Sequence, residues 1–250
     1  PSDAILAFRH FCDKIGKEKA KKCAFVLHTE PIDQNGTNLK SVREAFCDPD
    51  YVNVFFSSDK LMTAQMNLLY NMCDATILIS SNEGWGLALT ESLMTSTPII
   101  ATVTGGMQDQ MRFVDENGKW FTPSPDIPSN HRGTYKEHGE WVIPVFPSNI
   151  SVQGSPTTPY IFDDRVSIDD TAEAIFKMYS LGNKERIKIG KSGYDWVNGD
   201  EANMTAEKMS NNVIETLDDA FKSFKPRTSF DFYKITDRKT DYIKHKLTGY

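Results

Sequence analysis

The first hundred residues alternate between two hydrophobic patterns. Apolar residues recur at three- and four-residue spacing in the segments predicted to be helices, which are residues 4–15, 39–46, 62–72 and 87–94. Short, nearly continuous apolar runs form the segments predicted to be strands, which are residues 23–28, 52–56, 75–80 and 98–102. Strands that alternate with helices at this spacing build a parallel sheet covered by helices. We therefore predict an α/β fold.

This alternation of helix and strand patterns stops after Gly106. Residues 113–160 hold seven of the twelve prolines, which predicts a long irregular insertion over the surface, either a lid or an acceptor-side element. Helical spacing returns over residues 167–181, 183–197 and 202–224. Residues 225–250 are aromatic and charged, and we expect them to pack on another part of the protein. The predicted organisation is thus one domain over residues 1–224 and a C-terminal tail over 225–250.

Composition narrows the possible partners. The chain has 250 residues with 28 basic and 34 acidic side chains, a net charge of −6 and a pI near 5.4. No broad basic surface is expected, so a nucleic acid partner is not predicted. The four cysteines are far apart and form no Cys-x-x-Cys motif, which predicts neither a zinc site nor a disulfide framework and favours a reducing, cytoplasmic compartment. In a longer protein the chain could still lie at a membrane surface.

The strongest chemical signal is the segment 80–92, Ser-Ser-Asn-Glu-Gly-Trp-Gly-Leu-Ala-Leu-Thr-Glu-Ser. It runs from a strand end through a glycine-containing turn into a helix, where unpaired backbone N–H groups and the helix dipole favour a phosphate. Gly84 and Gly86 allow close approach of a ligand, and Glu83 and Glu91 supply carboxylates that suit vicinal hydroxyls. An ordinary strand-to-helix turn can contain the same residue types, so the physics alone leaves a purely structural role open.

Further motifs extend this signal. Glu83 and Glu91 flank seven residues, and Gly84-Trp85-Gly86-Leu87 follows the first of them. Residues 69–74 precede the strand, and residues 103–109 contain a glycine pair after the next strand. Together these motifs resemble the GT-B glycosyltransferases, in particular the large retaining family 4, or glycosyl transferases group 1. The resemblance covers residues 1–110 clearly and the later helices loosely. It implies a Rossmann-like sheet, the C-terminal half of a GT-B fold.

The resemblance also implies roles for individual residues in a nucleotide-sugar site. Glu91 would hold the ribose diol, and Glu83 would contact hydroxyls of the transferred sugar. The backbone of Gly84, Trp85, Gly86 and Leu87 would meet the diphosphate and the sugar. Gly105 and Gly106 would either approach the same phosphates or form a plain turn. The nucleobase would lie near Phe56, Ser57 and Ser58. Most members of the family work without a metal ion, so neither a metal nor another cofactor is expected.

The expected function is therefore transfer of a sugar from a nucleotide-diphosphate sugar to a glycan or lipid acceptor, with retention of configuration. The family's basic pair and its acceptor domain would lie upstream of Pro1, so this chain would be the donor-binding half of an enzyme and inactive alone. One alternative is a non-catalytic nucleotide-sugar-binding module or an isolated inactive half-enzyme. Another is a sugar phosphorylase or nucleotide-sugar epimerase of the same fold.

Some side chains outside the motif are given structural roles. His131 and His138 have no ligand partners at metal spacing, and we expect them to be solvated. Arg112 follows the glycine pair closely enough to reach an anion, but a surface arginine is the simpler interpretation. Trp141 and Tyr160 have rings that could stack on a sugar, but burial is expected for both.

Overall fold

A computed structural model describes residues 1–34, 36–121, 124 and 127–226. Contacts between residues divide the chain into a unit Pro1–Thr205 and a second unit Ala206–Tyr250. All strands and all predicted site residues belong to the first unit. In the second unit the structure describes helix α8 (Ala206–Ser223), and most of the tail predicted over 225–250 lies outside the described residues. The boundary predicted at residue 224 therefore stays a prediction.

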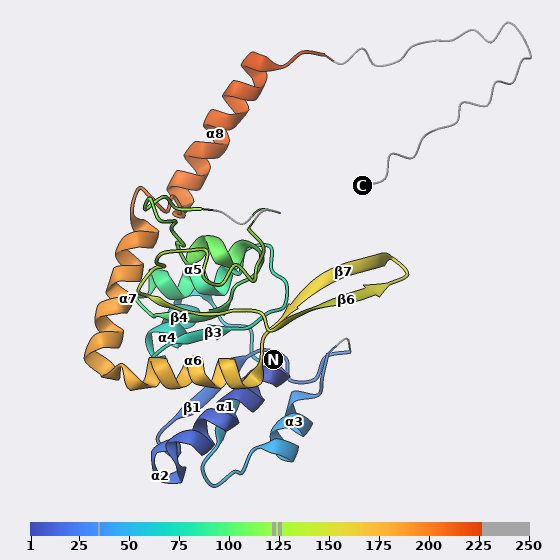
Figure 1. The fold of residues 1–250 in the computed structure, drawn as a ribbon, viewed down its shortest axis with the longest axis vertical. Helices are drawn as coiled ribbons and strands as arrows, with labels where there is room; N and C mark the ends of the chain where they lie inside the picture. The colour runs from blue at the N-terminus through green and yellow to red at the C-terminus, as the bar shows by residue number, and fades with distance from the viewer. Residues whose placement is uncertain (35, 122–123, 125–126, 227–250) are drawn as a thin grey trace, which may run out of the picture. The chain divides into compact units, whose positions relative to one another are not determined.

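The first unit is an α/β structure with two parallel sheets flanked by helices, which confirms the predicted fold class (Figure 1). The first sheet pairs β1 (Ala24–His28) with β2 (Asn53–Ser57). The second has the order β3 (Thr76–Leu78), β4 (Ile99–Thr102), β5 (Val142–Val145). The flanking helices are α1 (Ser2–Ile15), α2 (Lys17–Ala20), α3 (Leu39–Phe46), α4 (Thr63–Asn71), α5 (Leu87–Met94), α6 (Ile168–Ser180) and α7 (Gly182–Asn198).

In the part of the chain that the structure describes, the parallel strands form two sheets and not the single sheet that the sequence suggested. Among the described residues, β1 pairs only with β2, and β3 pairs only with β4, so each leaves one edge without a strand. Burial also differs along the second sheet, since β4 is fully buried whereas β3 is half-buried along its length. The apolar side chains of β3 predicted a strand buried on both faces, and in the structure its residues are only half-buried.

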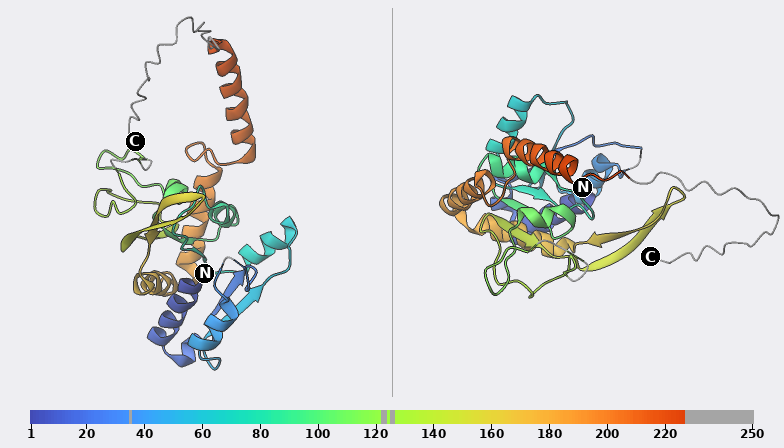
Figure 2. Two further views of the ribbon diagram at one scale, coloured as in Figure 1. Left: turned by 90° about the vertical axis from the view of Figure 1, so that its right-hand side faces the viewer. Right: turned by 90° about the horizontal axis from the view of Figure 1, so that it is seen from above.

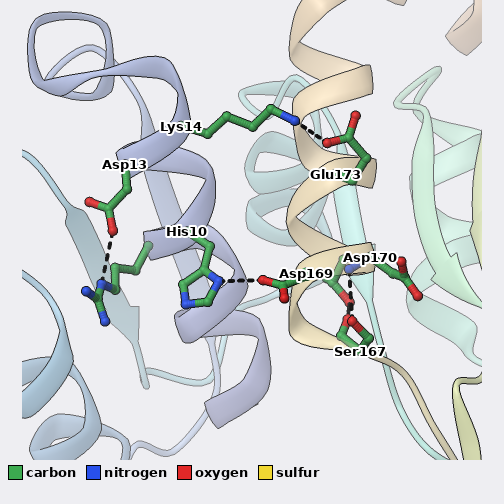
Figure 3. A network of polar contacts seen from close by, with 9 residues as sticks. His10, Asp13, Lys14, Ser167, Asp169, Asp170 and Glu173 are labelled. Atoms are coloured by element: carbon green, nitrogen blue, oxygen red, sulfur yellow. Dashed lines mark hydrogen bonds and ion pairs between the residues drawn. The ribbon is translucent and has the colours of Figure 1, made fainter.

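Helix α6 connects the cores of the two sheets. Ala172 packs in the apolar cluster of α1 and β2, whereas Ala174 and Met178 pack in the cluster of Ile100 and Val145 from the second sheet. Polar contacts also join α6 to α1, namely His10 to Asp169 at 2.8 Å and Lys14 to Glu173 (Figure 3). These pairs are exposed to solvent and add little stability, so the apolar contacts carry the packing of α6.

The segment 113–160 is more regular than predicted. It contains β5, which extends the second sheet, and the hairpin of β6 (Asn149–Ser155) and β7 (Thr158–Arg165) extends away from that sheet (Figures 1 and 2). The predicted irregular structure is therefore wrong for these parts. Proline misled the prediction, because Pro144 lies on the edge strand β5, where a missing backbone N–H interrupts no ladder in the described sheet.

Side-chain burial in this segment differs from the prediction at three residues. His138 is half-buried, with its Nδ1 2.8 Å from the carbonyl oxygen of Gly139, so it is not fully solvated. His131 is buried, with 3% of its surface exposed, among the rings of Phe113, Phe121 and Tyr135, so it is not solvated. Tyr160 is 62% exposed because it lies on the open apolar side of the hairpin, so its predicted burial is wrong. Composition does not reveal these surroundings, because they depend on ring packing for His131 and on strand pairing for Tyr160.

Two other predictions in and beside this segment are confirmed. Trp141 is buried and stacks on Trp196 of α7, with ring centroids 4.7 Å apart. Arg112 forms a two-point ion pair with Glu201, with N–O distances of 2.7 and 2.9 Å, which agrees with a structural role for this arginine. The cluster around Trp141 therefore ties the 113–145 segment to α5 and α7, and so to the elements that carry the predicted site.

We expect Gly190→Ala to destabilise the first unit. An added Cβ would lie 1.9 Å from the carbonyl oxygen of Ser96, just beyond α5, so α7 would have to move away from that backbone. Overpacking of this kind lowers the free energy of unfolding by about 2 kcal/mol, which outweighs the gain in helix propensity. Urea unfolding measures the effect. The control Lys184→Ala on the exposed side of α7 should stay near the wild type, and a Gly190→Ala variant as stable as the wild type would contradict the packing.

Stability should also fall in mild acid through His131. Burial lowers the pKa of His131 from its ordinary value of 6.5, so the folded state favours the neutral ring. As the pH falls below about 6.5 the unfolded chain takes up the proton first, and stability is lost in that window. The drop in unfolding free energy between pH 7.5 and 5.5 should therefore be smaller in His131→Phe than in the wild type. The control His28→Gln, at an exposed histidine, should lose as much unfolding free energy over this pH range as the wild type. An equal loss in the wild type, His131→Phe and His28→Gln would contradict the role of His131.

Candidate functional site

The predicted site forms the turn between β3 and α5. Gly86 caps α5 in a left-handed conformation, with φ of 83°, which a residue with a side chain rarely adopts. A Cβ there would also lie 3.0 Å from Met107 and 3.3 Å from Leu78. Gly84 is exposed and open, with nothing within 4 Å of an added Cβ. The two glycines thus have different roles, since Gly86 shapes the turn and Gly84 leaves the outer side of the turn open.

The first turn of α5 presents its amides at this point. Leu87 and Ala88 are the first two residues of the helix, and the first amides of a helix have no partner within it. Leu87 is 70% exposed, so the approach to this turn is open. Glu91 lies one turn further along, on the exposed side of the same helix. The helix therefore combines a positive end that suits a phosphate with a carboxylate about 6 Å along its axis.

The glycine pair that follows β4 packs directly on the turn. An added Cβ at Gly105 would lie 2.1 Å from the carbonyl oxygen of Glu83, and one at Gly106 would lie 2.1 Å from that of Gly84. The N–H of Gly106 donates to the Glu83 carbonyl at 3.2 Å. Both glycines belong to the short helix η1 (Gly105–Gln110). The structure thus gives this pair a packing role beside the turn, and any contact with a phosphate stays a prediction.

Gln110, at the end of η1, holds the turn from the other side. Its side-chain amide donates to the carbonyl of Trp85 at 2.6 Å and more weakly to that of Gly86 at 3.3 Å. The side-chain oxygen of Gln110 accepts from the hydroxyl of Thr90 at 2.7 Å, and the Thr90 hydroxyl accepts from the indole N–H of Trp85 at 2.9 Å. Gln110 is completely buried, so each of these contacts lies in a site with little water. Neither Gln110 nor Thr90 was predicted from the sequence, where they carry no motif of their own.

Each of the two glutamates has one carboxylate oxygen held by a neighbouring hydroxyl. Ser80, next to β3, donates to Oε1 of Glu83 at 2.9 Å. Tyr70 of α4 donates to Oε2 of Glu91 at 2.8 Å. Burial, together with the contact to Glu91, raises the pKa of Tyr70 well above its ordinary value, so this phenol remains a donor. The second oxygen of each glutamate has no hydrogen bond from the described residues.

The base of the β6–β7 hairpin closes one border of the site. The backbone N–H of Asp164 donates to the carbonyl of Ser81 at 2.9 Å, and the carboxylate of Asp164 accepts from Thr104 at 2.6 Å. Ser81 precedes Glu83 by two residues, and Thr104 precedes the glycine pair. The hairpin, which begins within the predicted insertion 113–160 and ends beyond it, is thus anchored through Asp164 to both loops that form the site.

The predicted base-binding residues lie on the other sheet. Phe56 and Ser57 end β2, and Ser58 follows them. The carbonyl of Ser57 accepts from the Thr29 N–H at 3.0 Å, and the Ser57 hydroxyl is 3.1 Å from Nδ1 of His28. Both groups of Ser57 therefore contact β1 or the residue that follows it. No hydrogen bond within the described residues joins this segment to the Glu83–Leu87 turn. Its role in base binding stays a prediction.

The described residues contain no group of three or more His, Cys, Asp or Glu side chains arranged to hold a metal ion. Within the same residues no helix is both long and apolar enough to span a bilayer. The chemistry that the site offers comes from backbone amides, a helix N-terminus, two carboxylates and their hydroxyl partners.

The segment that contains the turn between β3 and α5 is similar to a known protein family. Residues 52–129 match the family model "Glycosyl transferases group 1". The matched segment includes β2, β3, α5, β4 and η1, and hence every residue predicted to bind the donor. Curated protein sequences gave no match to the chain.

Solved structures with a similar fold are glycosyltransferases. An α,α-trehalose-phosphate synthase (UDP-forming) from Burkholderia vietnamiensis has a TM-score of 0.54 at 9% identity, over 87% of this chain and 42% of that one. A glycosyltransferase from Rickettsia africae has a TM-score of 0.52 at 15% identity, over 89% and 45%. The trehalose-phosphate synthase from Burkholderia xenovorans in complex with glucose-6-phosphate has a TM-score of 0.51 at 11% identity, over 86% and 40%. At these identities the likeness shows the shared fold, and the chain spans less than half the length of each.

We expect Gln110→Glu to disrupt the turn. The substitution replaces an N–H donor by a carboxylate oxygen that faces the carbonyls of Trp85 and Gly86 in a buried site. Loss of the donor together with an unpaired buried charge lowers the free energy of unfolding by about 3 kcal/mol. Thermal or urea unfolding measures this loss. The same substitution at exposed Gln153 should leave stability unchanged. A Gln110→Glu variant with wild-type stability would show that the network does not hold the turn.

Proposed function

We propose that this chain binds a nucleoside-diphosphate sugar and that the protein containing it transfers the sugar to a glycan or lipid acceptor. One observation carries the proposal. Glu83 and Glu91, each with one oxygen free, flank the exposed N-terminus of α5 within a segment that matches the glycosyl transferases group 1. The fold shared with solved glycosyltransferases supports it.

Each part of the donor finds chemistry that suits it in this site. The amides of Leu87 and Ala88 and the dipole of α5 would stabilise the diphosphate as its charge develops on departure, without calling on a metal ion. Glu91 would accept hydrogen bonds from the ribose hydroxyls. Glu83 would accept hydrogen bonds from the transferred sugar and favour the positive charge of an oxocarbenium-like state. The resemblance of the turn to family 4 supports retention of configuration.

The acceptor would be bound by a part of the protein outside these 250 residues. This is supported by coverage, because the chain spans 42% and 45% of two glycosyltransferases with a similar fold. The same coverage favours a second candidate function, namely donor binding by this chain without transfer. Hydrolysis or transfer assays on the 250-residue chain separate the two, since turnover by this chain alone would show that it needs no further part.

Nucleotide binding gives the direct test. One of UDP, GDP or ADP should raise the melting temperature of the chain, because a ligand that binds only the folded state adds about 2.7 kcal/mol at a hundred times its Kd. Glu91→Ala should weaken that binding about tenfold or more, since a hydrogen bond to a charged group is lost, while the melting temperature without ligand stays the same. Exposed Glu44→Ala on α3 is the matched control and should bind like the wild type.

Two outcomes would count against the proposal. If none of the three nucleotides or their sugars shifts the melting temperature of the wild type, the donor site is not present. If a nucleotide binds equally well to Glu91→Ala, it binds at another place on the chain.

A further inference from the structure

The hydrogen bond between Tyr70 and Glu91 joins two helices beside the candidate site. Tyr70 is in the last turn of α4, and Glu91 is in the second turn of α5. The phenol donates to Oε2 of Glu91 at 2.8 Å. Within the described residues this is the one hydrogen bond that reaches the Glu91 side chain. The other carboxylate oxygen therefore has no hydrogen-bond partner among these residues.

Tyr70 is well placed to hold that carboxylate. Its ring is half-buried, and its backbone carbonyl accepts from the hydroxyl of Thr97 at 3.1 Å, just ahead of β4. The rest of α4 is loosely covered, since none of its residues is fully buried and Leu68 is 67% exposed. Tyr70 thus belongs to the fixed end of α4. A short, fixed aromatic side chain can restrain an exposed glutamate, which by itself samples many rotamers.

A fixed side-chain orientation matters for a carboxylate that binds two neighbouring hydroxyls. To accept hydrogen bonds from two neighbouring hydroxyls, the plane of the carboxylate must face both, and a glutamate that is already oriented loses less freedom when the ligand binds. We propose that Tyr70 is a positioning residue that orients Glu91 toward the ribose hydroxyls and so gives the site its preference for a ribonucleotide over a deoxyribonucleotide. This inference rests on the proposed function, because it assumes that Glu91 meets the ribose.

The test is the affinity ratio between a ribonucleotide and its 2′-deoxy form. Isothermal titration of the 250-residue chain compares UDP, GDP and ADP with dUDP, dGDP and dADP. For whichever base binds, the wild type should favour the ribonucleotide about tenfold, the usual effect of losing one hydrogen bond to a charged group. Tyr70→Phe should reduce this preference to about threefold or less by weakening the ribonucleotide, with little change for the deoxynucleotide. A purely structural role would weaken both nucleotides equally and leave the ratio unchanged.

Tyr51→Phe is the matched control. Tyr51 also donates its hydroxyl to a carboxylate, that of Asp13 at 2.6 Å, away from the turn between β3 and α5. This variant should keep the wild-type ratio. If Tyr70→Phe does not fold, Tyr70→Gln and Tyr70→Leu give the same comparison, because only the amide of the first can donate to Glu91. A higher ratio for Tyr70→Gln supports the proposal, and equal ratios overturn it.

The outcomes separate this inference from the function on which it rests. If the wild type binds a ribonucleotide, Glu91→Ala weakens it, and Tyr70→Phe keeps the wild-type ratio, then the donor site stands and the positioning role of Tyr70 is overturned. If the wild type binds none of the six nucleotides, the proposed function fails and this inference fails with it.

Discussion

The candidate site depends on the close contact between two loops. Gly105 and Gly106 lie so near the carbonyls of Glu83 and Gly84 that any side chain at either position would collide with them. The contact forms because these two residues have no Cβ, and the N–H of Gly106 then bonds to the Glu83 carbonyl. The loop after β4 is therefore the support on which the loop after β3 takes its shape. Glu83 sits directly on this support.

Gln110 makes that contact specific. A glycine pair alone would let the two loops slide, whereas a buried amide bonded to Trp85, Gly86 and Thr90 fixes their relative position. The buried network is satisfied on both the donor and the acceptor side of the amide, which is the condition under which such networks rigidify a structure. Backbone amides that bind a charged group gain most when they are held in place beforehand. The turn thus has the rigidity that a diphosphate site requires.

Local pattern was enough to predict most helices and strands of the first hundred residues and the place of the turn between β3 and α5. The apolar spacing of residues 39–46 and 87–94 predicted helices that the structure confirms over the same residues. The glycine-containing turn was predicted because strand, turn and helix follow one another within a short stretch of chain. The spacing of Glu83 and Glu91 was interpreted through the resemblance to a known family, and their roles stay predictions. Features that depend on neighbours in sequence are the ones that a single sequence reveals.

Features that depend on distant neighbours were missed. Nothing near Tyr70 indicates that its hydroxyl meets Glu91, twenty-one residues away. Proline and glycine between residues 113 and 160 predicted irregular structure, although β5 tolerates Pro144 at a sheet edge and His131 is enclosed by aromatic rings. The separation into two sheets likewise follows from pairing among strands, which the apolar pattern of one strand does not reveal.

Hydrogen exchange on the chain with and without the nucleotide that binds tests the central claim most directly, because it reports on the backbone amides themselves. If the N-terminus of α5 holds the diphosphate, peptides covering residues 83–91 should exchange more slowly with ligand, and those covering the β6–β7 tip at 153–159 should not change. Binding without protection over residues 83–91, or with protection confined to another part of the chain, would contradict the account.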